Sequence, residues 1–175
     1  PKYIRKEKLM SPEEACSKIA NKLSNLDTTT ILFTSNLLKI EYYTPDLYGS
    51  YQRKDKAKKQ VNDRLTRRRS TIMQDEDENE VEEYLVFSRS IEWRGKNEYK
   101  PVDIAFQLSP ATKEEKELIE TADEKMLIVL FPTEQETKMG FLINGPYQTP
   151  PNRENIESTL DNPFNAHLIK ETCKL

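Results

Sequence analysis

The sequence lacks the residue patterns that build most enzymatic sites. No two of its four glycines lie closer than five positions, and none is followed by Lys-Ser or Lys-Thr, so it has no glycine-rich loop of the kind that cradles nucleotide phosphates in Walker-type or dinucleotide-binding proteins. It has one histidine, His167, and two cysteines, and with no clustered Cys/His a zinc site is not expected. It contains neither a G-x-S-x-G elbow nor an H-E-x-x-H motif. We therefore do not expect this chain to be an enzyme by itself.

Long hydrophobic runs are also missing. No apolar stretch approaches the roughly 20 residues needed to span a bilayer, and no signal-peptide pattern opens the chain. We therefore expect a cytoplasmic protein without a membrane partner. The net charge of −3 provides no global positive field to recruit nucleic acid. The chain begins with Pro1 in place of Met, which indicates a piece of a longer polypeptide.

The two cysteines, Cys16 and Cys173, lie near opposite ends of the chain, each on an apolar helical face. This placement favours small buried hydrophobic residues over a disulfide. His167 lies off the apolar stripe of its helix, which is typical of a solvated residue.

Hydrophobic periodicity predicts one α+β domain over residues 10–175, after a basic linker at residues 1–9. The first helix has Ser11 as its cap, Pro12 at its first position and Glu14 closing a capping box. Apolar residues recur on one face of this helix. We expect them to form a buried stripe: Cys16, Ile19, Ala20, Leu23 and Leu26.

Most of the remaining pattern predicts strands, at residues 38–42, 48–51, 84–93 and 101–109. The continuous apolar run MLIVLFPT (126–133) is typical of a central strand covered on both faces, and its proline ends it. We expect the following segment, MGFLINGPY, to be its antiparallel neighbour. A final helix starts with Asn162 as cap and Pro163 at its first position. The fold class is therefore α+β, with a mixed or antiparallel sheet and helices packed on one side.

Two charge blocks of opposite sign interrupt the strand pattern. Residues 53–69 carry nine Lys/Arg against two Asp, and residues 75–83 carry seven acids. Together, residues 53–83 suit a solvated charged ribbon whose arms attract each other, or a disordered excursion. The basic block would also suit phosphate-backbone binding, but it has no aromatic residue for stacking on bases. We favour a solvated face over a nucleic-acid partner.

The segment GPYQTPPNRENI (145–156) presents a single arginine, Arg153, after a stiff run with three prolines. Prolines lower the ordering cost of holding a side chain in place, and a guanidinium fork matches a phosphate or a carboxylate. The simpler interpretation is that Asn152 caps a short helix and Arg153 is a surface residue in its first turn. On local sequence alone, this simpler interpretation is favoured.

The C-terminal half resembles the domain that follows the ATP-binding domain in sacsin-like GHKL ATPases, relatives of the ninety-kilodalton heat-shock chaperone. The resemblance covers about residues 81–175, and more loosely 11–44, and includes EEYLVFSRSIE and VDIAFQL. Pro150 and Asn152 depart from the usual threonine and alanine and affect the hydrogen bonding expected in the loop. The motif matches are Phe131-Pro132-Thr133, Gly145-Pro146-Tyr147, Thr149, Pro151, Arg153-Glu154-Asn155-Ile156 and Pro163-Phe164-Asn165.

This resemblance implies a middle, or transducer-like, domain that couples ATP binding in a preceding domain to conformational change. It implies that Arg153 reaches the γ-phosphate of ATP, with Thr149 and Asn155 as supporting residues in nucleotide binding. The chain itself would hold no cofactor, since ATP with magnesium would sit in the preceding domain. The alternatives are a protein- or nucleic-acid-binding module that uses the basic arm at residues 53–69, and a purely structural spacer.

Overall fold

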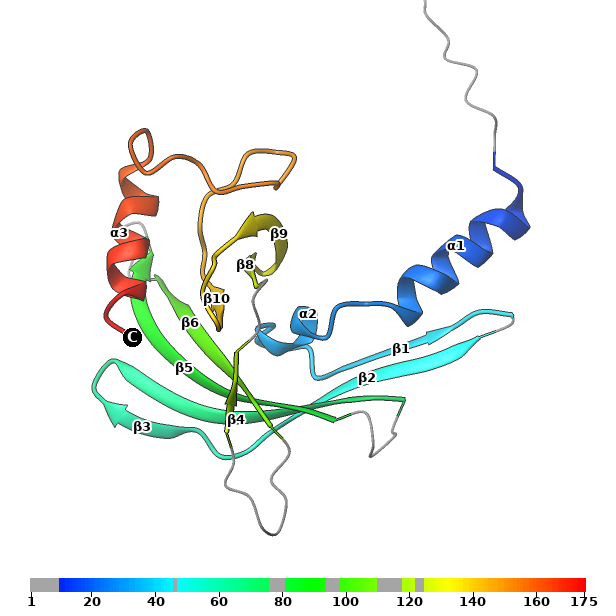
Figure 1. The fold of residues 1–175 in the computed structure, drawn as a ribbon, viewed down its shortest axis with the longest axis horizontal. Coiled ribbons are helices and arrows are strands. Elements are labelled where there is room, and N and C mark those ends of the chain that lie inside the picture. The colour runs from blue at the N-terminus through cyan, green and yellow to red at the C-terminus, as the bar shows by residue number, and fades with distance from the viewer. Residues whose placement is uncertain (1–9, 46, 76–80, 94–97, 110–117, 122–124) are drawn as a thin grey trace, which may run out of the picture.

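The computed structural model describes residues 10–45, 47–75, 81–93, 98–109, 118–121 and 125–175. The expected linker at residues 1–9 and the acidic positions 76–80 lie outside the described residues. The described chain is a single α+β domain with one mixed, largely antiparallel sheet and few helices (Figure 1). None of its helices is long and apolar enough to cross a membrane.

The helices of the described chain are α1 (Pro12–Ser24), α2 (Thr29–Leu32) and α3 (Pro163–Thr172). The strands are β1 (Lys39–Tyr43), β2 (Tyr48–Asp55), β3 (Lys59–Asn62), β4 (Leu65–Gln74), β5 (Val81–Trp93), β6 (Glu98–Leu108), β7 (Ile119–Glu120), β8 (Met126–Val129), β9 (Phe131–Glu136) and β10 (Leu142–Asn144). Their order in the sheet is β1-β2-β4-β5-β6-β10-β8-β9, while β3 pairs with β4 and β7 with β6. The helix starts at Ser11 and Asn162 are confirmed, as are the strands expected around residues 38–42, 48–51, 84–93 and 101–109.

The apolar run at 126–133 is not one central strand. The chain reverses at Leu130, whose φ is 66°, and β8 and β9 pair antiparallel on either side of it. The segment after it is not an antiparallel neighbour either, because β10 runs parallel to β8 and antiparallel to β6. A leucine with positive φ carries no sequence signature, so an apolar run conceals the turn.

Two buried clusters lie on opposite faces of the sheet. Val86 and Ala105 face each other across β5 and β6 and pack with α2 in the first cluster. Val102, on the other face of β6, packs with Leu168 of α3 in the second cluster. Side chains alternate between the two faces of a strand, so even- and odd-numbered residues of β6, such as Val102 and Ala105, pack into different clusters. The expectation of helices on one side is therefore wrong, because α2 and α3 cover different faces.

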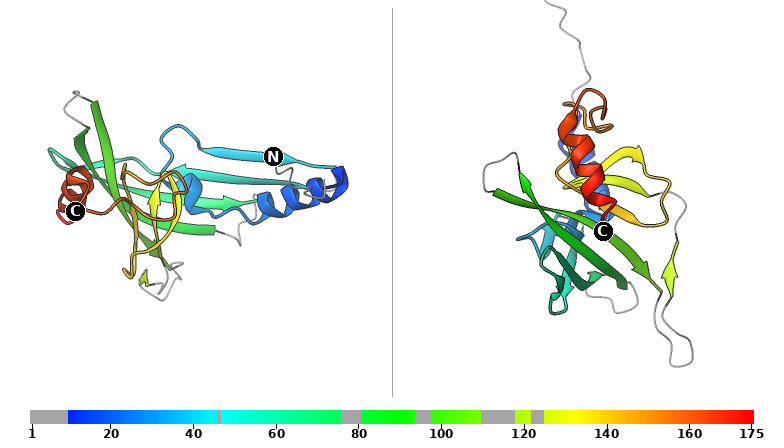
Figure 2. Two further views of the ribbon diagram at one scale, coloured as in Figure 1. Left: turned by 90° about the horizontal axis from the view of Figure 1, so that it is seen from above. Right: turned by 90° about the vertical axis from the view of Figure 1, so that its left-hand side faces the viewer.

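The buried stripe expected on α1 is also wrong. No residue of α1 is buried, and Ile19 is 56% exposed. Figures 1 and 2 show α1 beside an arm of β1 and β2 that extends away from α3. The sheet holds the last turn of α1 through the Tyr51 hydroxyl, which donates to the Leu23 carbonyl over 2.9 Å and accepts from the Leu26 amide.

The two cysteines are free, and they are less buried than expected. Cys16 is half-buried on α1, and Cys173 is exposed just after α3. The amphipathic pattern around Cys16 is present, but the helix that carries it is only partly covered by the described residues.

Most of the basic block is ordered β-structure. It forms the end of β2, the β3 strand and the first half of β4. The block and its acidic counterpart do attract each other, since Arg69 on β4 forms an ion pair with Glu83 on β5. Alternation along β4 divides its arginines between faces, because Arg67 pairs across to Phe87 and Arg68 to Val86. Even so, one hollow beside β4 is lined by five of these cations: Lys56, Lys59, Arg67, Arg68 and Arg69.

Candidate functional sites: an exposed arginine and a buried arginine pocket

Arg153 lies in a turn that follows β10, not in a helix. Its amide donates to the Pro150 carbonyl over 3.0 Å, and its φ of 59° is left-handed. Left-handed backbone cannot continue into an α-helix, and the next helix starts only at Pro163. The interpretation of Arg153 as a first-turn helix residue is therefore wrong.

The guanidinium of Arg153 folds back onto the tight β8–β9 turn. Its Nη2 donates to the Val129 carbonyl, and its central carbon lies 5.8 Å from the centre of the Phe131 ring. Within the described part of the chain, its Nε and Nη1 donate no hydrogen bond. Arg153 is exposed overall. One nitrogen of the guanidinium is thus held by the protein, while the residue as a whole is exposed.

The base of the Arg153 loop is fixed by Asn165 of α3, which is fully buried. Its Oδ1 accepts from the Gln148 amide over 2.8 Å, and its Nδ2 donates to the carbonyls of Gln148 and Glu157. Asn162 adds hydrogen bonds from its Nδ2 to the side chains of Gln148 and Glu157. Both ends of the segment 148–157 are therefore pinned to the start of α3.

The other two residues expected at this site lie nearby in the chain but have no visible role. Asn155 is exposed and Thr149 is half-buried. Neither side chain makes a hydrogen bond to any other described residue. Arg153 and Asn155 thus share one exposed loop, with Thr149 at its base.

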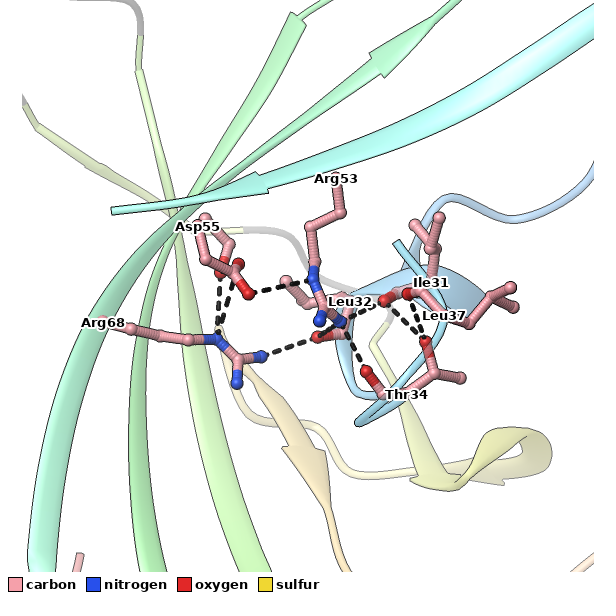
Figure 3. Close-up of polar contacts among 8 residues, drawn as sticks. Ile31, Leu32, Thr34, Leu37, Arg53, Asp55 and Arg68 are labelled. Carbon is pink, nitrogen blue, oxygen red and sulfur yellow. Dashed lines mark hydrogen bonds and ion pairs between the residues drawn. The ribbon is translucent and has the colours of Figure 1, made fainter. Parts of the chain in front are cut away.

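A second arginine site, which the sequence pattern did not reveal, lies where β2 and β4 meet α2 (Figure 3). Arg53 is only 5% exposed, although it opens the basic block that was expected to be solvated. Its Nη1 donates to the carbonyls of Ile31, Leu32 and Thr34, the latter two over 2.9 and 2.7 Å. These carbonyls belong to α2 and the residues after it, so Arg53 satisfies acceptors at the helix end.

Arg68 completes this site from the neighbouring strand. Its Nη2 donates to the Leu32 carbonyl over 2.6 Å, and its Nε donates to the Ser70 hydroxyl over 3.0 Å. Asp55 lies between the two arginines, with its Oδ2 at 3.2 Å from the Arg53 Nε and its Oδ1 at 3.8 Å from the Arg68 Nε. The Arg53 Nε is close enough for an ion pair but is not aligned for a hydrogen bond. Burial lowers the pKa of Arg53, and the carboxylate of Asp55 opposes that shift.

These side chains line a cavity of about 340 Å³. Lys56 and Lys58 add two exposed cations to its wall, and Asp103 from β6 also lines it. Burial raises the pKa of Asp103, and its carboxyl oxygen accepts a hydrogen bond from the Asn144 side chain over 2.8 Å. The cavity therefore holds four basic side chains against two acidic ones.

Sequence reasoning missed this site for an identifiable reason. A segment with nine basic residues among positions 53–69 indicates a solvated surface, and its charge pattern does not mark Arg53 as the buried one. One signal was available, since the alternation of β2 places Arg53 on the same face as Tyr51, a buried core residue.

We compared the chain with protein-family models, with curated proteins and with solved structures, and none of them matches it. The family likeness of residues 81–175 therefore depends on the motif residues alone.

Proposed function

We propose that this chain is a non-catalytic coupling module of a GHKL-type ATPase. In this role it receives a nucleotide-binding domain of the same polypeptide and supplies Arg153 to the γ-phosphate of ATP. ATP and its magnesium ion belong to that preceding domain, and this chain contributes positioning and charge.

The observation that carries the proposal is the way Arg153 is held. The segment 148–157 is pinned at both ends to Asn162 and Asn165. One nitrogen of the guanidinium is fixed on the Val129 carbonyl, and two have no partner among the described residues. An arginine that acts on another domain must be positioned in advance, because ordering it at the moment of contact costs free energy.

The apolar stripe of α1, which is only partly covered, supports the same proposal. Ile19 is 56% exposed, and Cys16, Ala20 and Leu23 are half-buried. An amphipathic helix buries its stripe against another element. We assign that element to the preceding domain.

The mechanism needs only one charged contact. Negative charge builds up on the transferred phosphoryl group, and a fixed guanidinium stabilises it more than it stabilises bound ATP. Arg153 would therefore raise the rate of hydrolysis with little effect on ATP affinity. Thr149 and Asn155 would support the loop at the nucleotide.

The test is ATP turnover by the full-length polypeptide that contains this chain, with Arg153→Ala. We expect turnover to fall roughly ten-fold or more while ATP affinity changes little. Lys170→Ala, an exposed cation on α3, is the matched control and should leave turnover unchanged. Thermal melting of each variant shows whether loss of the Val129 contact alone accounts for the effect. Unchanged turnover in a folded Arg153→Ala variant would refute the role of Arg153.

The competing function, a nucleic-acid-binding module based on residues 53–69, has weaker support. Arg53 and Arg68 are already engaged with the carbonyls at the end of α2. Arg67 and Arg69 do line one hollow with Lys56 and Lys59, but no aromatic residue lies in its lining for stacking on bases.

A further inference from the structure

The arginine pocket has more donors than its own structure uses. Arg53 Nη1 and Arg68 Nη2 satisfy the carbonyls at the end of α2. Figure 3 shows that each guanidinium has a second terminal nitrogen without an interaction, and no described residue accepts from either of them. Two arginines from neighbouring strands therefore leave unfilled hydrogen-bonding capacity in one cavity.

Part of the unused capacity of Arg53 is buried. Its side chain is 3% exposed and its Nε lacks a well-aligned acceptor, whereas its free terminal nitrogen is not one of the fully buried atoms. A buried guanidinium with unpaired N–H groups loses hydration without full compensation. If the two arginines served only to cap α2, one guanidinium would have been sufficient for the Leu32 carbonyl, which both of them bind.

The charge around the cavity favours a dianion. Arg53, Arg68, Lys56 and Lys58 face Asp55 and Asp103, which leaves two positive charges if both acids are ionised. Asp55 is already shared between the arginines, so it does not compensate the lysines. Guanidinium forks match phosphate oxygens in geometry, and nearby lysines add point charges.

The size of the cavity limits the ligand. A volume of about 340 Å³ lies at the lower end of the range for small-molecule sites, which is about 300–1,000 Å³. Ser35, Ser88 and Ser90 line it, and since the Ser88 side chain is hydrogen-bonded to Asp103, Ser35 and Ser90 are the serines that can hydrogen-bond a small polar ligand. A nucleic acid strand, in contrast, is bound in an open groove that follows its backbone.

We propose that the pocket between β2, β4 and α2 binds the phosphate group of a small organic phosphate. The free terminal nitrogens of Arg53 and Arg68 hold the phosphate oxygens, and Lys56 and Lys58 close the rim. Because the carbonyls of α2 share the same two guanidinium groups, ligand binding also fixes α2 on the sheet. The proposal does not depend on a coupling role for Arg153, which lies on a separate loop.

The test is titration of the purified chain with inorganic phosphate and with glycerol 3-phosphate, followed by NMR of the arginine Nε–Hε signals. We expect saturable shifts of two arginine signals, with stronger binding of the ligand whose hydroxyls reach the serines. Arg68→Gln should abolish binding. Lys56→Gln combined with Lys58→Gln should weaken it about ten-fold, since each rim cation contributes about three-fold. Both lysines are exposed, so this double variant is expected to fold.

Lys54→Gln is the matched control, because Lys54 is exposed on β2 but does not line the cavity. It should leave phosphate binding unchanged. Absence of saturable phosphate binding, or equal weakening by Lys54→Gln and the double lysine variant, would overturn the proposal. A single-stranded oligonucleotide that binds with a steep salt dependence, where free phosphate does not bind, would also overturn it. That result would assign the basic block to a nucleic-acid surface.

Discussion

Arg53 and Arg153 both donate to backbone carbonyls of a distant segment, but they do so from opposite positions relative to solvent. Arg53 is buried and satisfies three carbonyls with one nitrogen. Arg153 is exposed and satisfies the single carbonyl of Val129. The backbone differs in the same way, since Arg53 lies within β2 and Arg153 in a left-handed turn.

The difference separates two uses of a guanidinium group. At Arg53, the protein surrounds the charge, so a ligand must enter the fold to reach it. At Arg153, the protein pins the loop on both sides and leaves the charge outside, so the arginine can reach a partner. The first site is suited to a small ligand, and the second to contact across a domain boundary.

Removing each arginine gives the sharpest form of this comparison. Arg53→Met leaves the carbonyls at the end of α2 and the carboxylate of Asp55 without their donor, in a buried place. We expect a loss of about 3–5 kcal/mol in the free energy of unfolding. Arg153→Met removes one exposed hydrogen bond and should cost less than about 1 kcal/mol. Urea denaturation of both variants measures the two values. Equal costs would mean that the two arginines do not differ as described.

The sequence predicts the elements whose signals are local. The caps at Ser11 and Asn162 and the alternation in β5 and β6 depend on neighbouring residues, so the corresponding elements are present. The reversal at Leu130 was missed because a hydrogen bond from its amide to the Asn144 side chain, 14 residues later, supports a conformation that leucine disfavours.

The two candidate sites also differ in whether a local sequence signal predicts them. Arg153 could be singled out because prolines surround it, and its loop is indeed exposed. The alternation with Tyr51 could have indicated that Arg53 is buried, but not the pocket, because the acceptors of Arg53 are carbonyls about twenty positions earlier, at Ile31 and Leu32. The pattern of charges along a segment predicts whether the segment is solvated. It does not show that backbone carbonyls of a distant segment will accept hydrogen bonds from one of its arginines.

The anchor of the Arg153 loop offers a test of intermediate size. Asn165→Ala removes three hydrogen bonds to backbone groups of Gln148 and Glu157 at a position that is fully buried. We expect a loss of about 2–3 kcal/mol in the free energy of unfolding, since the abandoned groups are partly buried. Amide hydrogen exchange of residues 148–157 should become faster.

Asn155→Ala is the matched control for this test, because Asn155 lies in the same loop, is exposed and makes no hydrogen bond to a described side chain or backbone group. It should change stability by less than about 0.5 kcal/mol. If Asn165→Ala left the exchange of the loop unchanged, the loop would not depend on α3 for its position, and the case for an arginine positioned in advance would fail.

The smallest expected effect concerns the backbone of Arg153. Arg153→Gly and Arg153→Ala both remove the guanidinium, so their difference reports the cost of a left-handed residue with a side chain at φ 59°. We expect the glycine variant to be more stable than the alanine variant by about 0.5–1 kcal/mol, after the greater unfolded-state entropy of glycine is counted. Thermal and urea denaturation can resolve this difference. An alanine variant that is the more stable one would show that the loop in solution is not left-handed at this residue. If the glycine variant is the more stable one, the backbone conformation favours glycine at position 153. The presence of arginine there is then explained by the contacts of its guanidinium group and not by the stability of the loop.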